Sequence, residues 1–151
     1  MVRTLKVYKD DTVVASEQGE GKVSITLSNL EADTTYPKGT YQVSWEKDGK
    51  ESSTIDVPEF KTKPILVTGL SFVPDYKTLK VGSSDTVEPN IAPSTATNKT
   101  LKYTSEHPEF VTVDENTGVI QGVAEGTSII TATSTDGSDK SGQITVTVSN
   151  E

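Results

Sequence analysis

The stretch VTVDENTGVIQGVAEGTSIITATSTDG, residues 111–137, decides the fold of this protein. Short runs in which apolar and polar residues alternate are separated by segments rich in Gly, Asn and acidic residues, which is typical of β-strands joined by turns. The expected strands cover residues 111–113, 119–123 and 129–133, and the expected turns cover residues 114–118 and 125–126.

The acidic residues of this stretch also allow a calcium site. Asp114 and Asn116 have the spacing that opens an EF-hand loop, and Glu125 stands where that loop has its bidentate glutamate. However, the flanking segments indicate strands rather than helices, and Asn116 and Gly118 suit the positive-φ positions of a hairpin turn. The turn is therefore favoured, and a calcium site formed by Asp114, Asn116 and Glu125 is the weaker alternative.

The same pattern extends along the whole chain, and no window has helical periodicity. The sequence therefore predicts an all-β protein with two small tandem β-sandwich (Ig-like) domains. Pro58 and Pro64 interrupt the strand pattern and mark the boundary. We expect a small β/Ig-like docking module at residues 1–60, a linker at 61–66 and a second domain at 67–151. Before the boundary, the expected strands are TLKVY, KVSITL, TYQVSW and STIDV, with turns at KDD, GEG, PKG and KDGK.

Charge and composition exclude several classes of function. The net charge of −8 argues against binding to nucleic acid, and residues 65–151, with five basic and eleven acidic groups, carry most of it. No apolar run is long enough to span a membrane, and MVRTLKVYKDD lacks the apolar core of a secretory signal. The chain has no cysteine, and its single histidine, His107, precedes a proline in an expected loop. We therefore expect no enzymatic activity and no cofactor.

The aromatic residues divide into expected core and expected surface. Tyr41 and Trp45 share one strand face with Val43, which favours a place in the core, and Tyr36 suits a tyrosine corner. Tyr76 and Phe60 lie near turns and the boundary, so they are the candidate ligand-contact residues.

Residues 66–149 resemble the bacterial immunoglobulin-like domain, group 2, which occurs in intimin-like adhesins and phage virion proteins. The resemblance rests on several motifs in order: a VTGL opening, a strand end with Leu79, Val81 and Gly82, the PSTATNK segment from Pro93, the turn around Asp114 to Gly118, and a GTSIITAT strand. Tyr103 stands where the family often has Trp. More weakly, residues 1–60 resemble a shortened fibronectin type III or Ig-like module, and a module of this length is expected to have a thin core.

The resemblance implies a non-enzymatic structural protein of a tailed phage, a capsid decoration or head-fibre protein. Residues 1–60 would bind a capsid or tail protein, and the second domain would be displayed on the virion surface after assembly in the host cytoplasm. Weak adhesion to host cell-wall carbohydrate would follow, and a homo-oligomer is compatible with the sequence. The alternatives are a fragment of a bacterial cell-surface adhesin or cell-wall stalk protein, and a carbohydrate-binding accessory module of an enzyme.

Overall fold

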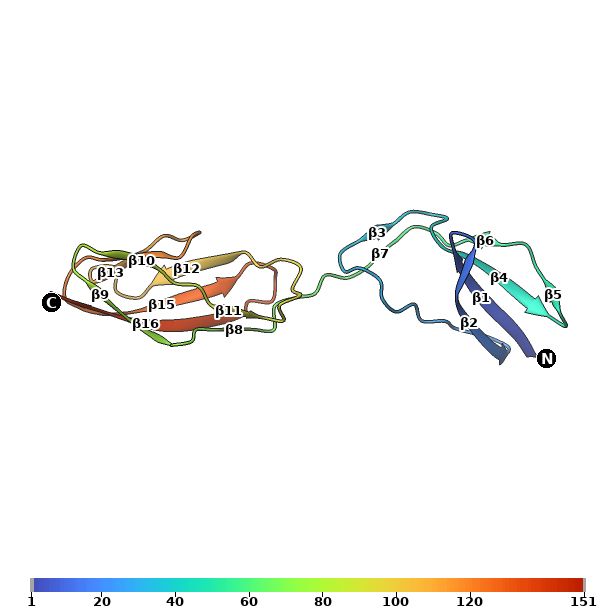
Figure 1. The fold of residues 1–151 in the computed structure, drawn as a ribbon, viewed down its shortest axis with the longest axis horizontal. Helices are drawn as coiled ribbons and strands as arrows, with labels where there is room; N and C mark the ends of the chain where they lie inside the picture. Colours follow the sequence, from blue (N-terminus) through green and yellow to red (C-terminus); the bar gives the residue numbers. More distant parts are fainter. Residues whose placement is uncertain (1, 151) are drawn as a thin grey trace. The chain divides into compact units, whose positions relative to one another are not determined.

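In the computed structural model of the chain, residues 2–150 are described. The protein is all-β: none of these residues forms a helix, and therefore none forms a helix long and apolar enough to cross a membrane. The chain divides into two compact units, residues 1–63 and 64–151 (Figure 1).

The first unit is built around an antiparallel sheet with the strand order β2-β1-β4-β5, in which β6 also pairs with β4. Strands β3 and β7 form a separate pair. Its strands are β1 (Val2–Lys9), β2 (Thr12–Glu20), β3 (Thr35–Tyr36), β4 (Gln42–Lys47), β5 (Lys50–Glu51), β6 (Ile55–Asp56) and β7 (Phe60–Lys61). The two hairpins close as the sequence predicts. Asp10 and Asp11 have positive φ between β1 and β2, and Asp48 and Gly49 do so between β4 and β5.

The core of the first unit is thin. Among its described residues, Val7 and Tyr41 are the buried hydrophobic side chains, while Trp45 is only half-buried beneath the guanidinium of Arg3. The prediction that Tyr41 belongs to the core is thus confirmed. The expected strand KVSITL is wrong, because residues 22–27 join no sheet, and the long strand β2 lies where the sequence pattern predicted none.

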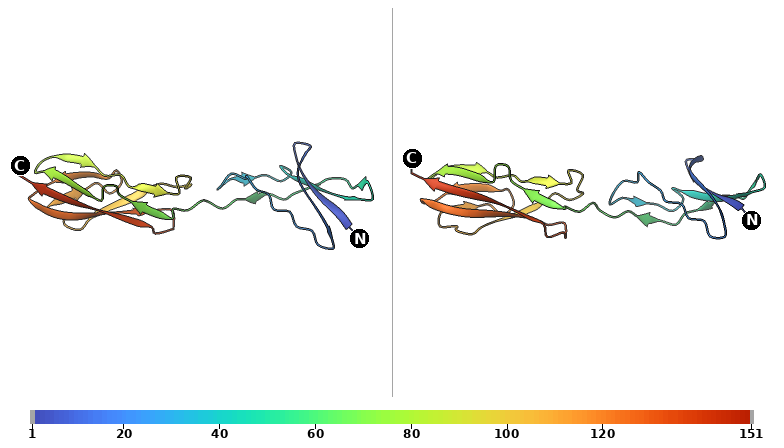
Figure 2. Two further views of the ribbon diagram at one scale, coloured as in Figure 1. Left: turned by 60° about the horizontal axis from the view of Figure 1, so that its bottom comes forward. Right: turned by 90° about the horizontal axis from the view of Figure 1, so that it is seen from below.

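The second unit is a β-sandwich (Figures 1 and 2). A four-stranded sheet, β12-β15-β16-β9, is antiparallel except that β9 runs parallel to β16. It faces a three-stranded sheet, β10-β14-β13, and the pair β11-β8. The strands are β8 (Gly69–Ser71), β9 (Tyr76–Lys80), β10 (Ser84–Thr86), β11 (Asn90–Ala92), β12 (Leu101–Ser105), β13 (Val111–Val113), β14 (Val119–Gly122), β15 (Gly126–Ser134) and β16 (Ser141–Ser149).

Buried and exposed side chains alternate along most strands of this sandwich, and the buried ones fill its core. Every second residue of β16 is buried, including Ile144, Val146 and Val148, and β15 contributes Ile130 and Ala132 from the same sheet. The opposite layer supplies inward-facing side chains such as those of Val111 and Ile120 to the same cluster. The strands predicted at residues 111–113, 119–123 and 129–133 correspond to β13, β14 and β15 in the structure.

Candidate functional site

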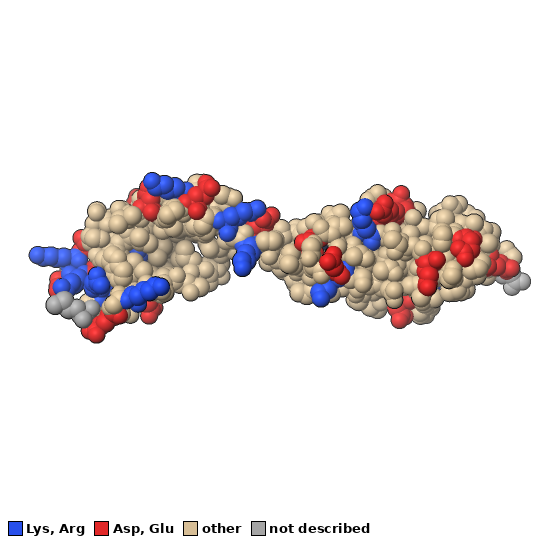
Figure 3. Space-filling view, turned by 180° about the vertical axis from the view of Figure 1, so that it is seen from behind, with Lys and Arg blue, Asp and Glu red and all other residues tan. Residues whose placement is uncertain are grey.

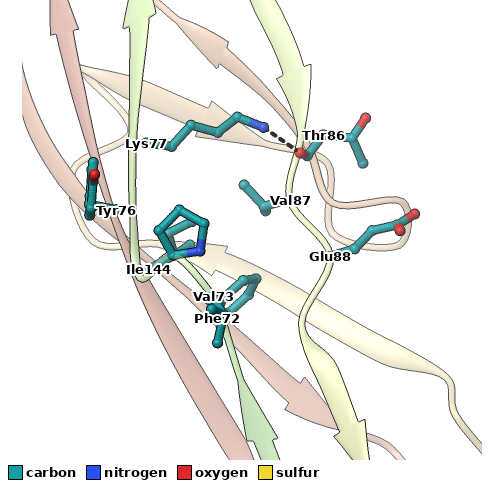
Figure 4. A pocket seen from close by; sticks show the side chains of 9 residues that line it. Phe72, Val73, Tyr76, Lys77, Thr86, Val87, Glu88 and Ile144 are labelled. Carbon is teal, nitrogen blue, oxygen red and sulfur yellow. Dashed lines mark hydrogen bonds between the residues drawn. The ribbon is translucent and has the colours of Figure 1, made fainter.

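A surface pocket of about 200 Å³ lies beside the start of β9 and contains the predicted contact residue Tyr76 (Figure 4). Its lining comes from four separate segments: the chain that follows β8, the first two residues of β9, the end of β10 with the chain that follows it, and β16. The lining residues are Phe72, Val73, Pro74, Tyr76, Lys77, Thr86, Val87, Glu88 and Ile144.

The pocket combines an apolar base with exposed rims. Phe72, Val87 and Ile144 are buried parts of the sandwich core, and so they form a fixed floor. The side chains at the edge are open to solvent, with Val73 81% and Tyr76 66% exposed. Val73 and Tyr76 thus place exposed apolar surface beside a hollow with an apolar floor, and this combination makes the pocket a candidate site.

Polar groups close the side of the pocket between β9 and β10. The Lys77 ammonium donates to the Thr86 carbonyl at 2.9 Å (Figure 4). It also forms an ion pair with Asp85 at 2.6 Å. The hydrogen bond from Lys77 and that from the Thr86 amide hold the pKa of Asp85 below its usual range. Glu88, on the same rim, presents an exposed carboxylate. An aromatic ring, an apolar floor and charged hydrogen-bonding groups together suit a sugar, which has apolar ring faces and hydroxyl edges.

Phe60, the second predicted contact residue, lies in the first unit and has a different environment. Its ring stacks on Tyr36 with centroids 5.2 Å apart and also contacts the buried ring of Tyr41. The Tyr36 hydroxyl accepts a hydrogen bond from the Glu31 amide at 2.9 Å, as expected for a tyrosine corner. Phe60 is half-buried in this aromatic cluster, so its ring packs against side chains of the first unit.

The turn at residues 114–118 is held by its own aspartate. Asp114 Oδ1 accepts hydrogen bonds from the amides of Asn116 (3.0 Å) and Thr117 (2.8 Å) and from the Thr117 hydroxyl (2.8 Å). These bonds, with that of the Thr117 hydroxyl the largest contribution, lower the pKa of Asp114. Gly118 has a φ of 70°, as predicted, but Asn116 does not have the positive φ that the sequence suggested.

In the weaker calcium alternative, Asp114 and Asn116 belong to one turn, whereas Glu125 has a separate role. Asp114 Oδ1 is occupied by the turn, and Glu125 accepts a hydrogen bond from the Asn150 amide at 3.3 Å. Within residues 2–150, no three side chains of His, Cys, Asp or Glu gather closely enough to hold a metal ion. His107 is exposed, with its ring beside Glu109 (3.1 Å) and Phe110.

The sequence pattern does not predict the polar cluster around Glu51. Glu51 on β5 accepts hydrogen bonds from Ser44 and Tyr8 and from the ammonium of Lys6 at 2.9 Å. These bonds, led by that from Ser44, lower the pKa of Glu51 to about 2. Lys6 also contacts Glu46, and the two carboxylates raise its pKa. Period-2 alternation does place Lys6 and Tyr8 on one face, but β5 is too short to reveal Glu51 as their partner.

Charge is distributed unequally between the units. On the face shown in Figure 3, the second unit exposes mainly Asp and Glu, whereas the first unit exposes Lys and Arg beside acidic side chains. This agrees with the excess of acidic residues in the second half of the sequence.

Comparison with known proteins shows a family match in the second unit. The family model of the bacterial Ig-like domain (group 2) matches residues 66–148. An Ig-like virion protein of Serratia phage KSP90 is 44% identical over 85 residues, which cover 56% of this chain and 33% of that protein. A 3-O-alpha-D-galactosyl-alpha-L-arabinofuranosidase of Bifidobacterium longum subsp. longum is 39% identical over 88 residues, covering 58% of this chain and 8% of that enzyme.

A likeness to a solved structure extends over more of the chain. The S-layer protein SbsC superimposes on 98% of this chain with a TM-score of 0.52 and 19% sequence identity, and the match takes up 20% of the S-layer chain. At that identity the likeness shows the fold alone. This chain thus spans a third or less of the length of each of these three proteins.

Proposed function

This chain belongs to the bacterial Ig-like domain (group 2) family, and from that premise we propose that it is a non-enzymatic structural protein of a tailed-phage particle. The observation that carries the proposal is the 44% identity of the second unit to an Ig-like virion protein of a phage. The structure of this unit fits such a role, since its sandwich core is continuous and its surface is acidic.

In this proposal the protein is a capsid decoration or head-fibre protein. The first unit binds a capsid or tail protein, and the second is displayed on the particle surface after assembly in the host cytoplasm. The first unit has the features of a binding module: a thin core and exposed apolar side chains at Val2, Val13, Val14 and Ile55. Burying such side chains against a partner would add apolar contact that the unit does not make by itself.

The displayed unit would contact host cell-wall carbohydrate through the Tyr76 pocket. One shallow pocket of this size offers only weak affinity, but many copies on one particle would bind a polymeric glycan with high effective concentration. A segment of an arabinofuranosidase is 39% identical over 88 residues, so a similar domain also occurs in an enzyme that acts on a carbohydrate. This occurrence favours a second candidate function, a carbohydrate-binding accessory module attached to a catalytic domain.

A particle-binding assay tests the virion assignment. Purified protein is mixed with phage particles that lack it, and the particles are sedimented. We expect the protein to sediment with them, and to lose that ability when Val13 and Val14 are both changed to Glu while the circular dichroism spectrum is unchanged. A chain that stays in the supernatant with particles from every host-matched phage assayed would refute the particle assignment.

A carbohydrate-binding assay tests the pocket separately. The chain is displayed in many copies on beads and mixed with purified host cell-wall polysaccharide. Changing Tyr76→Ala should weaken binding about fivefold, since a stacked aromatic ring contributes roughly 1 kcal/mol, while Tyr76→Phe keeps the ring and should bind nearly normally. Equal binding by the Ala and Phe variants would contradict the assignment of Tyr76, whatever the particle assay shows.

A further inference from the structure

Residues 22–30 form a strand-like segment that pairs with no strand among residues 2–150. The apolar residues Val23, Ile25 and Leu27 are half-buried, and the intervening Ser24 and Thr26 are exposed, which is the alternation of a strand with one covered face. Yet residues 22–30 belong to no sheet and make no backbone hydrogen bond with any other part of residues 2–150. Figure 1 draws this segment as a plain trace between β2 and β3.

The covered face of the segment lies against β2. A Cβ placed on Gly19 would be 3.1 Å from the Val23 side chain, so this side chain lies over Gly19 near the end of β2. Further along, a cavity of about 250 Å³ separates Thr26 and Leu27 from Val14, Ala15 and Tyr41. The apolar side chains are thus half-buried, while the amide and carbonyl groups of the segment have no partner within residues 2–150. Unpaired strand edges are templates for another strand.

We propose that residues 22–28 pair antiparallel with the same residues of a second copy of this chain, which makes the protein a dimer through its first unit. An unpaired backbone edge is recognised by an extended strand, whose hydrogen-bonding groups have the same repeat. The segment is self-complementary, and for that reason the partner strand is a second copy rather than a different protein.

The two-fold symmetry allows only a few registers, and one of them satisfies every position. Residues directly opposite in an antiparallel pair share a face. When Ile25 pairs with itself, Val23 lies opposite Leu27 and Ser24 lies opposite Thr26. All three apolar side chains then meet apolar partners, and Lys22 meets Ser28, so no like charges oppose one another. Moving the centre by one residue to Thr26 would place Val23 opposite Asn29, and moving it to Ser24 would place Leu27 opposite Gly21.

Sedimentation equilibrium of the full chain tests the dimer. We expect the average mass to rise toward that of a dimer between about 1 μM and 1 mM, since a short strand pair associates weakly. Changing Ser24→Lys together with Thr26→Lys puts like charges opposite each other and should weaken association about tenfold. The pair Ser24→Glu with Thr26→Glu should behave likewise, and mixing the two variants should restore the dimer. Lysines at the exposed Ser53 and Thr54 are the matched control.

Disulfide trapping tests the register, because the chain has no cysteine of its own. Directly opposite residues have Cα atoms about 4.5–5.5 Å apart, within disulfide range, whereas diagonal neighbours are about 7–8 Å apart. A mixture of Ser24→Cys and Thr26→Cys chains should form the mixed disulfide much faster than either variant forms its own. A parent chain that remains monomeric at 1 mM, a dimer unaffected by the charged pairs, or equal trapping in all three samples would each overturn the proposal.

Discussion

Gly118, in the turn between β13 and β14, offers the sharpest test of how the second unit is held together. Its φ of 70° lies in the left-handed region, and a Cβ added there would lie 2.6 Å from the Val87 carbonyl oxygen and 2.8 Å from the Tyr103 ring. Neither neighbour can move easily, since both side chains are buried and the Val87 amide donates to the Gly118 carbonyl at 2.9 Å. We therefore expect Gly118→Ala to destabilise the unit strongly.

The magnitude follows from two separable contributions. The left-handed conformation costs a residue with a Cβ about 1–2 kcal/mol, and forcing a methyl group into a packed site costs about 1–3 kcal/mol. Their sum predicts a loss of about 2–5 kcal/mol for Gly118→Ala.

At two other glycines, substitution by Ala should incur only one of these two costs, either the conformational cost or the crowding cost. Gly137 has a φ of 89° with open space where its Cβ would be, so Gly137→Ala should cost only the conformational part. Gly122 has no such φ, but its Cβ would lie 2.7 Å from the Lys80 carbonyl oxygen, so Gly122→Ala should cost only the crowding part.

Urea unfolding followed by circular dichroism measures these changes, and fluorescence of the single tryptophan, Trp45, reports the first unit separately. The loss for Gly118→Ala should be close to the sum of the other two, and the Trp45 transition should be unchanged in all three variants. A Gly118→Ala variant no less stable than Gly137→Ala would refute the reasoning, because it would mean that the Val87 carbonyl and the Tyr103 ring do not confine this turn.

The remaining predictions concern charged side chains. Asp136→Ala should lower the melting temperature of the second unit by several degrees in calorimetry, because Asp136 accepts the Val67 amide at 2.6 Å and the Ser138 hydroxyl at 2.6 Å, and an unchanged value would contradict this. The pKa of Glu51 is lowered to about 2, so its contribution to the first unit is complete above about pH 4.5 and is lost as the pH falls toward 2. Trp45 fluorescence should show this acid transition, and Glu51→Gln should flatten it. Millimolar calcium should leave the melting temperature of the second unit unchanged, because Asp114 is occupied by its own turn; a rise would support the calcium alternative.

Most strands of the second unit could be predicted because they bury one face, whereas β10 is exposed along its length. In β16 the alternation of buried Ile144, Val146 and Val148 with exposed polar residues is unbroken, and only one register keeps these side chains inside. The Asp114 turn was likewise visible, though the assignment of a positive φ to Asn116 was wrong. The side chain of Asp114 bonds to the amides of Asn116 and Thr117, and this leaves Gly118 as the left-handed residue.

The first unit could not be predicted in this way, because alternation shows which face is covered and not whether the edge is paired. KVSITL has a better strand pattern than TVVASEQGE, yet the second is β2 and the first joins no sheet. β2 is selected by the hairpin at Asp10 and Asp11, which returns the chain directly onto β1. Local turn geometry therefore outweighed the apolar pattern in this part of the chain.

The candidate site shows the same limit. Tyr76 stood out in the sequence as an aromatic residue near a turn, but its pocket also needs Val73 and Glu88 from segments that only the sandwich brings together. The Glu51 cluster was hidden for a related reason: its hydrogen-bonding partners Lys6, Tyr8 and Ser44 come from two other strands.

The two units differ in how fully they bury apolar side chains and pair backbone groups, and this difference indicates where association should occur. The second unit buries a continuous apolar core and ties its turns to its own aspartates, Asp114 and Asp136, so little in it calls for a partner. The first unit relies on the polar contacts of Glu51 and the aromatic contacts of Phe60, and leaves residues 22–30 without backbone partners among residues 2–150. Since an unpaired strand gains more from a partner than a closed sandwich does, variants that block association should map to the first unit, and variants that change carbohydrate contact should map to the pocket around Tyr76.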